Sequence, residues 1–276
     1  MAEQVGRTAR HRSPVTVRWR WVAGGGAAVL AAILGVAVLL QTTGGPACAA
    51  LPAASAGHAG IATFYTPGGG TGNCSFPSLP ADGLYVALSP PEYAAAGACG
   101  GYLDVTGRTG TVRVKVVDQC PGCAAGHLDL SRQAFARIDD PVRGQVPIRY
   151  TAVVNPQPAA ALSFVVKTGS SQYWLAILVD GAGNPLSTVE VKVGGGWQAL
   201  ARQDYDYWLA AGGAGKGPFT LRVTDTYGHQ VTASGIGLSP GTVQRSTAHL
   251  YGPGAGTAGT TKAAPSPAAR RTPAAP

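Results

Sequence analysis

The chain has 276 residues, a formal net charge of +8 and a charged fraction of 12%. Most of the excess positive charge lies near its ends: residues 1–21 carry five arginines against one glutamate, and residues 252–276 carry three basic residues, whereas the stretch between holds 13 basic and 12 acidic residues. A nucleic-acid-binding protein needs its basic residues on the folded surface, so this distribution argues against nucleic acid as a partner.

Residues 1–56 are predicted to direct the chain to a membrane. The basic residues 1–21 precede an uncharged run at 22–40, which is long enough to span a bilayer as a helix. Small-residue sites at 47–49 and 54–56 fit recognition by signal peptidase. We expect either a cleaved signal peptide or a retained anchor, with the rest of the chain secreted or held on the outer face of the membrane.

Residues 57–155 are predicted to form a small β domain. Short β-prone apolar runs alternate with Gly, Pro, Asn and Asp, and they lie at 61–65, 84–88, 102–105, 112–117 and 148–154. Short helices are expected near 91–96 and 131–138. Strands at this density without a long amphipathic helix indicate a barrel or a sandwich.

The cysteines are Cys48, Cys74, Cys99, Cys120 and Cys123. Cleavage of the signal would remove Cys48, and four cysteines in an oxidising compartment favour two disulfides with three possible pairings. We favour Cys74–Cys99 and Cys120–Cys123. A redox motif at Cys120–Cys123, or a metal site with a nearby histidine, is the alternative, but neither has its usual sequence context, and no metal site is predicted.

Two carboxylates and a histidine lie close together in a turn-rich part of this domain. Asp118 follows the apolar run at 112–117 and enters a Pro-Gly turn, while His127 and Asp129 come after a short loop and before the helix. Functional carboxylates are common on loops held by a rigid scaffold. The alternative is structural: Asp118 would cap the turn and Asp129 the helix.

The remaining chain divides into three parts. Two prolines make residues 156–161 a semi-rigid linker. Residues 162–251 are predicted to form an antiparallel sandwich, with strands at 164–166, 174–179, 189–193, 205–209, 219–223 and 231–233. Residues 252–276 have almost no apolar bulk and are predicted to be disordered.

Several motifs in these two domains resemble expansins. They are Gly60–Tyr65, Val117–Asp118 and His127–Ser131 in the first domain, and Lys167–Trp174 and Asp204–Tyr205 in the second. The resemblance covers about residues 57–251. It implies an all-β fold, in which a six-stranded double-psi β-barrel precedes an immunoglobulin-like carbohydrate-binding sandwich. Inverting endoglucanases and lytic transglycosylases of the rare lipoprotein A type share this barrel.

The resemblance also implies a groove on the barrel, with candidate residues Thr63, Tyr65, Asp118, His127 and Asp129. Thr63 would hold Asp129 through a hydroxyl hydrogen bond, or it is an ordinary strand residue. Asp129 occupies the place of the general acid in the related glucanases. Inverting hydrolysis would need a second carboxyl group about 6.5 to 9.5 Å away. Some bacterial members have a groove tyrosine where this chain has Cys120.

In the second domain, the resemblance implies a sugar-stacking row of Tyr173, Trp174 and Tyr205, with Lys167 beside it to hydrogen-bond sugar hydroxyls. Strand alternation allows only one of Tyr173 and Trp174 to face outward, unless the strand bulges or twists strongly there. The alternative places Trp174 in the core. Three further aromatic candidates are Trp197, Tyr207 and Trp208.

The resemblance implies a secreted monomer that loosens cell-wall polysaccharide without hydrolysis and without a cofactor. Its polysaccharide partner would be cellulose, xylan or peptidoglycan. The first alternative is an enzyme, a peptidoglycan lytic transglycosylase or an endoglucanase, that uses Asp129 as general acid. The second is a membrane-tethered wall-binding module whose barrel is inert.

Overall fold

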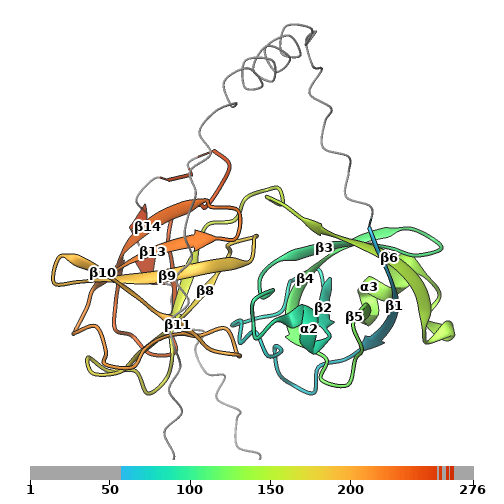
Figure 1. The fold of residues 1–276 in the computed structure, drawn as a ribbon, viewed down its shortest axis with the longest axis horizontal. Coiled ribbons are helices and arrows are strands. Elements are labelled where there is room, and N and C mark those ends of the chain that lie inside the picture. The colour runs from blue at the N-terminus through green and yellow to red at the C-terminus, as the bar shows by residue number, and fades with distance from the viewer. Residues whose placement is uncertain (1–56, 254, 257–258, 261, 264–276) are drawn as a thin grey trace, which may run out of the picture. The chain divides into compact units, whose positions relative to one another are not determined.

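The computed structural model describes residues 57–253, 255–256, 259–260 and 262–263 (Figure 1). The predicted signal or anchor in residues 1–56 therefore lies outside the described residues. Within the described ranges, no helix has the length and apolar character needed to cross a membrane.

The first domain is a closed barrel with the strand order β1-β5-β2-β4-β3-β6. Its strands are β1 His58–Tyr65, β2 Tyr85–Leu88, β3 Tyr102–Thr106, β4 Thr111–Gln119, β5 His127–Ser131 and β6 Val146–Val153. Two parallel pairs, β1–β5 and β2–β4, are combined with antiparallel ones. Figure 1 shows the strands closing around the core. The predicted six-stranded double-psi β-barrel is confirmed.

Alternating side chains and one helix fill the barrel. In β4, Val112, Val114 and Val116 are buried, while the residues between them are more exposed. Helix α3, Arg132–Ile138, packs against β1, β4 and β5 and buries Phe135. The Ser131 hydroxyl accepts a hydrogen bond from the N–H of Ala134 and so caps this helix. The suggestion that Asp129 caps it is wrong.

Two local predictions in the barrel were wrong. The stretch from His127 to Asp129 was expected as a loop before the helix, but it belongs to β5. Its pairing partners, β1 and β2, are distant in sequence, so local composition does not reveal the strand. Helix α2 is Pro90–Tyr93 and ends before the expected Ala96, since Ala94, Ala95 and Ala96 take positive φ.

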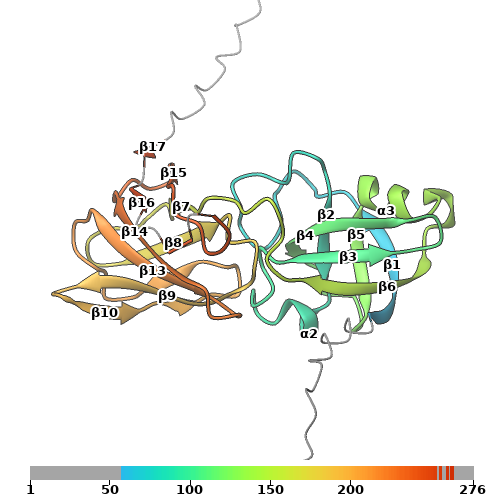
Figure 2. The ribbon, with the colours of Figure 1, turned by 90° about the horizontal axis from the view of Figure 1, so that it is seen from above.

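The second domain is the predicted sandwich of two sheets, which Figure 2 shows from a second direction. One sheet has the order β10-β9-β13-β14-β16 and the other β11-β12-β8-β7-β15-β17. The strands are β7 Ser163–Val166, β8 Leu175–Asp180, β9 Leu186–Val193, β10 Gly196–Ala199, β11 Ala201–Arg202, β12 Trp208–Ala210, β13 Phe219–Asp225, β14 Gln230–Ile236, β15 Val243–Arg245, β16 Gly259–Thr260 and β17 Lys262–Ala263.

Three stretches of this domain differ from the expected strands. Trp174 precedes β8 instead of starting it, and the expected strand at 205–209 begins only at Trp208, because residues 204–206 form a turn. The tail was predicted to be disordered, yet β16 and β17 pair with β14 and β15. Backbone pairing at a sheet edge needs no apolar side chains. Residues 264–276 of that tail lie outside the described residues.

Both predicted disulfides are present. Cys74–Cys99 joins the loop after β1 to the segment before β3, and Cys120–Cys123 closes the short loop after β4. Cys74 is fully buried in the barrel core. The first disulfide spans 25 residues and the second only three, so the first constrains the unfolded chain more strongly.

We therefore expect unequal losses of stability when each disulfide is replaced by two alanines. Loop-closure entropy predicts a loss of about 3.5 kcal/mol for Cys74→Ala with Cys99→Ala, and about 1.5 kcal/mol for Cys120→Ala with Cys123→Ala. Urea unfolding at equilibrium measures both. Equal losses of stability in the two variants would contradict the conclusion that Cys74–Cys99 constrains the unfolded chain more strongly than Cys120–Cys123 does.

Candidate functional site

Three of the predicted groove residues, Thr63, Asp129 and Asp118, form a polar row across four neighbouring barrel strands. Thr63 on β1 pairs with Asp129 on β5, Asp129 with Ala87 on β2, and Ala87 with Asp118 on β4. Strands are spaced about 4.8 Å apart, which puts the Cα atoms of the two aspartates about 10 Å apart. The residues on either side of Asp129 are buried in the core, so the row faces outward.

Thr63 connects His127 to Asp129. Its Oγ1 lies 2.6 Å from Asp129 Oδ1 and 2.9 Å from His127 Nε2. An ionised carboxylate only accepts hydrogen bonds, so the threonine hydroxyl donates to Asp129 and accepts from the imidazole. His127 then carries a hydrogen on Nε2. The three side chains form a chain of hydrogen bonds that fixes the orientation of Asp129.

Asp118 is held by three donors. Its Oδ1 accepts from the backbone N–H groups of Asn73, at 2.7 Å, and Gln119, at 2.8 Å, and its Oδ2 accepts from the Tyr65 hydroxyl at 3.2 Å. Burial, followed by the charge of Asp118, raises the pKa of Tyr65, so the phenol stays protonated and keeps donating. Asp118 lies within β4, and it holds the loop that contains Asn73 by accepting a hydrogen bond from the backbone of that loop.

The loop that Asp118 holds must come very close to it. Gly72 has a φ of +91°, and a side chain there would collide with Asp118 and with the carbonyl oxygen of Val117. An open hollow beside Asp118 is lined by this glycine-rich loop, residues 66–73, and by Tyr65. The hollow extends the polar row. Tyr65 supplies an aromatic ring beside Asp118.

The three residues of the predicted sugar-stacking row, Tyr173, Trp174 and Tyr205, lie in two turns. Tyr173 is 74% exposed and Trp174 is half-buried, in a tight turn closed by a hydrogen bond from Ser171 N–H to the Trp174 carbonyl. Because both rings precede β8, strand alternation does not apply to them. Trp174 is not a core residue; the buried tryptophan is Trp208, which is 3% exposed.

Lys167 lies beside a pair of tyrosines. Its Nζ is 5.7 Å from the ring centroid of Tyr205 and 5.2 Å from that of Tyr207. The two ring centroids are 5.8 Å apart. These distances allow cation–π attraction, which orients the ammonium group next to the rings. Trp197, another candidate, lies on β10 of the other sheet, where Arg222 stacks on it.

One short segment of the barrel, residues 73–75, connects the polar row to the aromatic turn at residues 204–206. The side-chain amide of Asn73 donates to the carbonyl of Asp204 at 3.0 Å, and the Ser75 hydroxyl donates to the carbonyl of Tyr205 at 2.8 Å. The same Asn73 donates its backbone N–H to Asp118. The sequence does not single out Asn73 or Ser75, because no local pattern marks contacts with residues about 130 positions away.

Asp206 is the buried residue of the turn at 204–206. It is 6% exposed and adopts the left-handed backbone with a φ of +68°. Burial raises the pKa of its carboxyl well above the usual value, with the positive charge of Arg202 acting in the opposite direction. A carboxyl group whose pKa is raised by folding stabilises the fold below its unfolded pKa, and this contribution is lost as pH rises.

We therefore expect the stability of the Asp206→Asn variant, measured relative to the wild type, to be greater at pH 7 than at pH 4. Asparagine tolerates the left-handed backbone, and its amide stays neutral. The difference between variant and wild type in the free energy of unfolding should move in favour of the variant by at least about 1 kcal/mol between the two pH values. Urea unfolding measures it. Asp204→Asn, in the same turn but exposed, is the control; a difference independent of pH would contradict the assignment.

Comparison with known proteins identifies the family. Residues 58–150 match the family model described as lytic transglycolase, and residues 162–236 match the expansin C-terminal domain. Expansin-YoaJ of Bacillus subtilis is 31% identical over 178 residues, which cover 63% of this chain and 76% of that protein.

Two solved structures are similar to the described fold. One is the apo crystal structure of an expansin from Clavibacter michiganensis, and the other is an aspartate-to-asparagine variant of it in complex with cellohexaose. Each is 46% identical, with a TM-score of 0.68, and the match covers 70% of this chain and 98% of the other. The chain belongs to the expansin family.

Proposed function

We propose that this expansin acts outside the cytoplasm as a monomer and loosens cell-wall polysaccharide without cleaving it. The barrel groove grips one glucan chain while the aromatic turns hold the same polymer, and binding strain weakens hydrogen bonds between chains. The observation that carries this proposal is the in-register row of Thr63, Asp129 and Asp118, connected through Asn73 to the turn of Tyr205.

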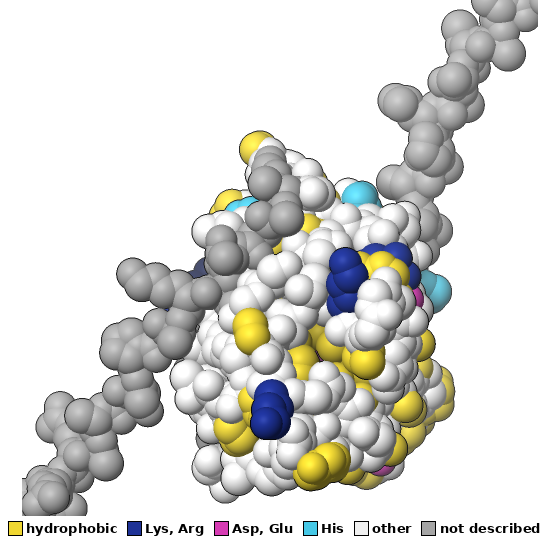
Figure 3. Space-filling view, turned by 90° about the vertical axis from the view of Figure 1, so that its left-hand side faces the viewer, with side chains coloured by type: hydrophobic (Ala, Val, Ile, Leu, Met, Phe, Trp, Pro, Cys, Tyr) yellow, Lys and Arg dark blue, Asp and Glu magenta, His cyan; other side chains and the backbone are white. Residues whose placement is uncertain are grey.

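The aromatic turns favour a glucan as the ligand. Sugar rings present apolar C–H faces, which stack on exposed aromatic side chains such as Tyr173. The Lys167 ammonium beside Tyr205 adds a hydrogen-bond donor for sugar hydroxyls. On the face shown in Figure 3, Lys and Arg side chains lie in separate spots within a mostly uncharged surface. The Clavibacter michiganensis variant crystallised with cellohexaose makes cellulose the first candidate, ahead of xylan and peptidoglycan.

The hydrogen bonds of the two aspartates favour binding over hydrolysis. Inverting hydrolysis needs one carboxyl group as acid and a second as the base that activates water. Asp118 already accepts from Asn73, Gln119 and Tyr65, so its role is to fix the loop. Asp129 accepts from Thr63 and is left to hydrogen-bond a sugar hydroxyl.

The second candidate is a lytic enzyme, which the family model matched by the barrel favours. In that case Asp129 would protonate the leaving oxygen of a glycosidic bond in peptidoglycan or glucan. The two candidates differ in their products. Binding alone releases no new chain ends, whereas hydrolysis releases reducing ends and lytic transglycosylation releases anhydro-muropeptides.

The purified protein should therefore weaken cellulose paper without releasing reducing sugar, and Asp129→Asn should abolish the weakening. The amide keeps the size of the side chain and one oxygen that can accept from Thr63, but it removes the negative charge and replaces the second acceptor oxygen with a donor. Extensometry and product analysis on cellulose, xylan and peptidoglycan measure both. Reducing ends that increase with dose would establish the endoglucanase alternative, and anhydro-muropeptides the transglycosylase.

Thr63 should matter through its hydroxyl. Thr63→Val keeps the shape and removes the link between His127 and Asp129, and a hydrogen bond to a charged group contributes about 1.5 to 3 kcal/mol. We expect paper weakening to fall about tenfold or more, while Thr63→Ser retains most of it. Equal loss in the two variants, with melting temperatures unchanged, would show that the hydroxyl is not what the groove requires.

A further inference from the structure

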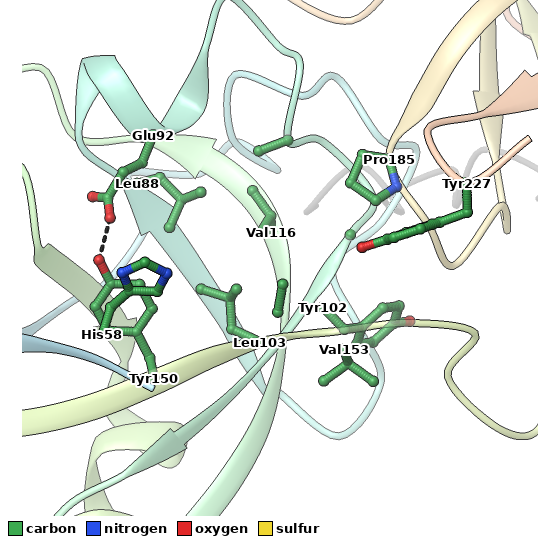
Figure 4. Close-up of a pocket in the computed structure, with 13 residues that line it drawn as sticks. His58, Leu88, Glu92, Tyr102, Leu103, Val116, Tyr150, Val153, Pro185 and Tyr227 are labelled. Carbon is green, nitrogen blue, oxygen red and sulfur yellow. Dashed lines mark hydrogen bonds between the residues drawn. The ribbon is translucent and has the colours of Figure 1, made fainter. Parts of the chain in front are cut away.

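A second cavity is lined mainly by barrel residues, with Pro185 and Tyr227 of the second domain at one end, and none of the groove residues line it. It has a volume of about 320 Å³ and is shown in Figure 4. Leu88 of β2, Leu103 of β3 and Val116 of β4 form its aliphatic middle, and aromatic side chains line both ends. Thr63, Asp118 and Asp129 do not line it. The glucan groove therefore does not account for this space.

One end of the cavity is polar and rigid. Glu92 accepts from the Ser89 hydroxyl at 2.7 Å, from the Gly126 N–H at 3.1 Å and from the Tyr150 hydroxyl, so both carboxylate oxygens are engaged. The hydrogen of the Tyr150 hydroxyl is used, and its oxygen is left as an acceptor. The His58 ring lies beside it, with ring centroids 5.5 Å apart. Figure 4 shows these three side chains together.

The opposite end is aromatic. Tyr102 and Tyr227 lie there with Pro185, and Tyr227 is 47% exposed. Tyrosine and proline rings offer flat apolar surfaces on which another ring stacks. The lining of the cavity therefore changes from one end to the other: rings line one end, aliphatic side chains line the middle, and hydrogen-bonding groups line the other end.

These features exclude two classes of ligand. A sugar carries hydroxyl groups on every side, and the aliphatic middle would leave several of them without partners at a cost of about 1 to 3 kcal/mol each. An anionic ligand would place its charge near the carboxylate of Glu92, which disfavours it. An uncharged and mainly apolar molecule with one polar end matches the lining, in a volume near the lower limit of small-molecule sites.

We propose that this cavity binds a small neutral phenol, with one aromatic ring and a short side chain. The phenolic hydroxyl donates to the Tyr150 oxygen beside His58, the ring lies between Leu88 and Leu103, and the side chain extends toward Tyr102 and Tyr227. Burial, together with the hydrogen bond to Glu92, raises the pKa of Tyr150, which keeps that phenol protonated and hydrogen-bonded to Glu92. This site is independent of the glucan groove.

The proposal is tested by titrating the full chain with 4-hydroxycinnamyl alcohol, using methyl NMR and calorimetry. Cinnamyl alcohol, which lacks the phenolic hydroxyl, is the matched probe. We expect saturable binding of the first probe with shifts at Leu88, Leu103 and Val116, and binding of the second about fivefold weaker, as loss of one neutral hydrogen bond predicts. No saturable binding, or shifts confined to residues of the groove, would overturn the proposal.

Variants that fill the cavity provide the second measurement. Ala152 lines the cavity and is exposed, so Ala152→Phe inserts a ring without displacing the core; Leu103→Trp fills the middle. Each should weaken binding at least tenfold. Ala136→Phe, on the exposed face of α3, is the matched control and should bind as wild type does. Unchanged affinity in a filled variant with the wild-type melting temperature would also overturn the proposal.

Discussion

The hydrogen bonds of Asn73 are the interaction on which the rest of the site depends. Its backbone N–H fixes Asp118 in the polar row, and its side chain fixes the carbonyl of Asp204, next to Tyr205. The Cys74–Cys99 disulfide holds the adjacent residue in the barrel core. The row of Thr63, Asp129 and Asp118 on the barrel and the turn of Tyr205 on the sandwich are thereby connected, and the Tyr93 hydroxyl adds a further hydrogen bond to the carbonyl of Asp204.

The barrel topology explains why the polar row exists at all. Its residues come from β1, β2, β4 and β5, and they share one face because the parallel and antiparallel pairings put Thr63, Asp129, Ala87 and Asp118 in register. Ala87, which lies between the two aspartates in this register, is 2% exposed. The opposite faces of the same strands supply the apolar core, so each strand contributes both to stability and to the groove.

Much of this architecture is predictable from the sequence, and the exceptions have a physical pattern. Apolar runs identified five barrel strands, and cysteine spacing with the expected compartment favoured the observed disulfides. β5 was overlooked because His127–Ser131 is stabilised by β1 and β2, which are far away in the sequence. The hydrogen bond from Thr63 to Asp129 was anticipated from the family resemblance, whereas the contacts of Asn73 and Ser75 were not. The roles of the groove residues and of the sugar-stacking residues, and the domain limits, stay predictions.

The most direct measurement of the central claim is paper weakening by a variant that combines Asn73→Ala, Ser75→Ala and Tyr93→Phe. This variant keeps the backbone N–H that holds Asp118 but loses the side-chain hydrogen bonds of all three residues to the carbonyls of Asp204 and Tyr205. If the groove residues and the aromatic turns must hold one polymer together, paper weakening falls several-fold, while binding to cellulose and the melting temperature change little. Full weakening activity in this folded variant would contradict the account.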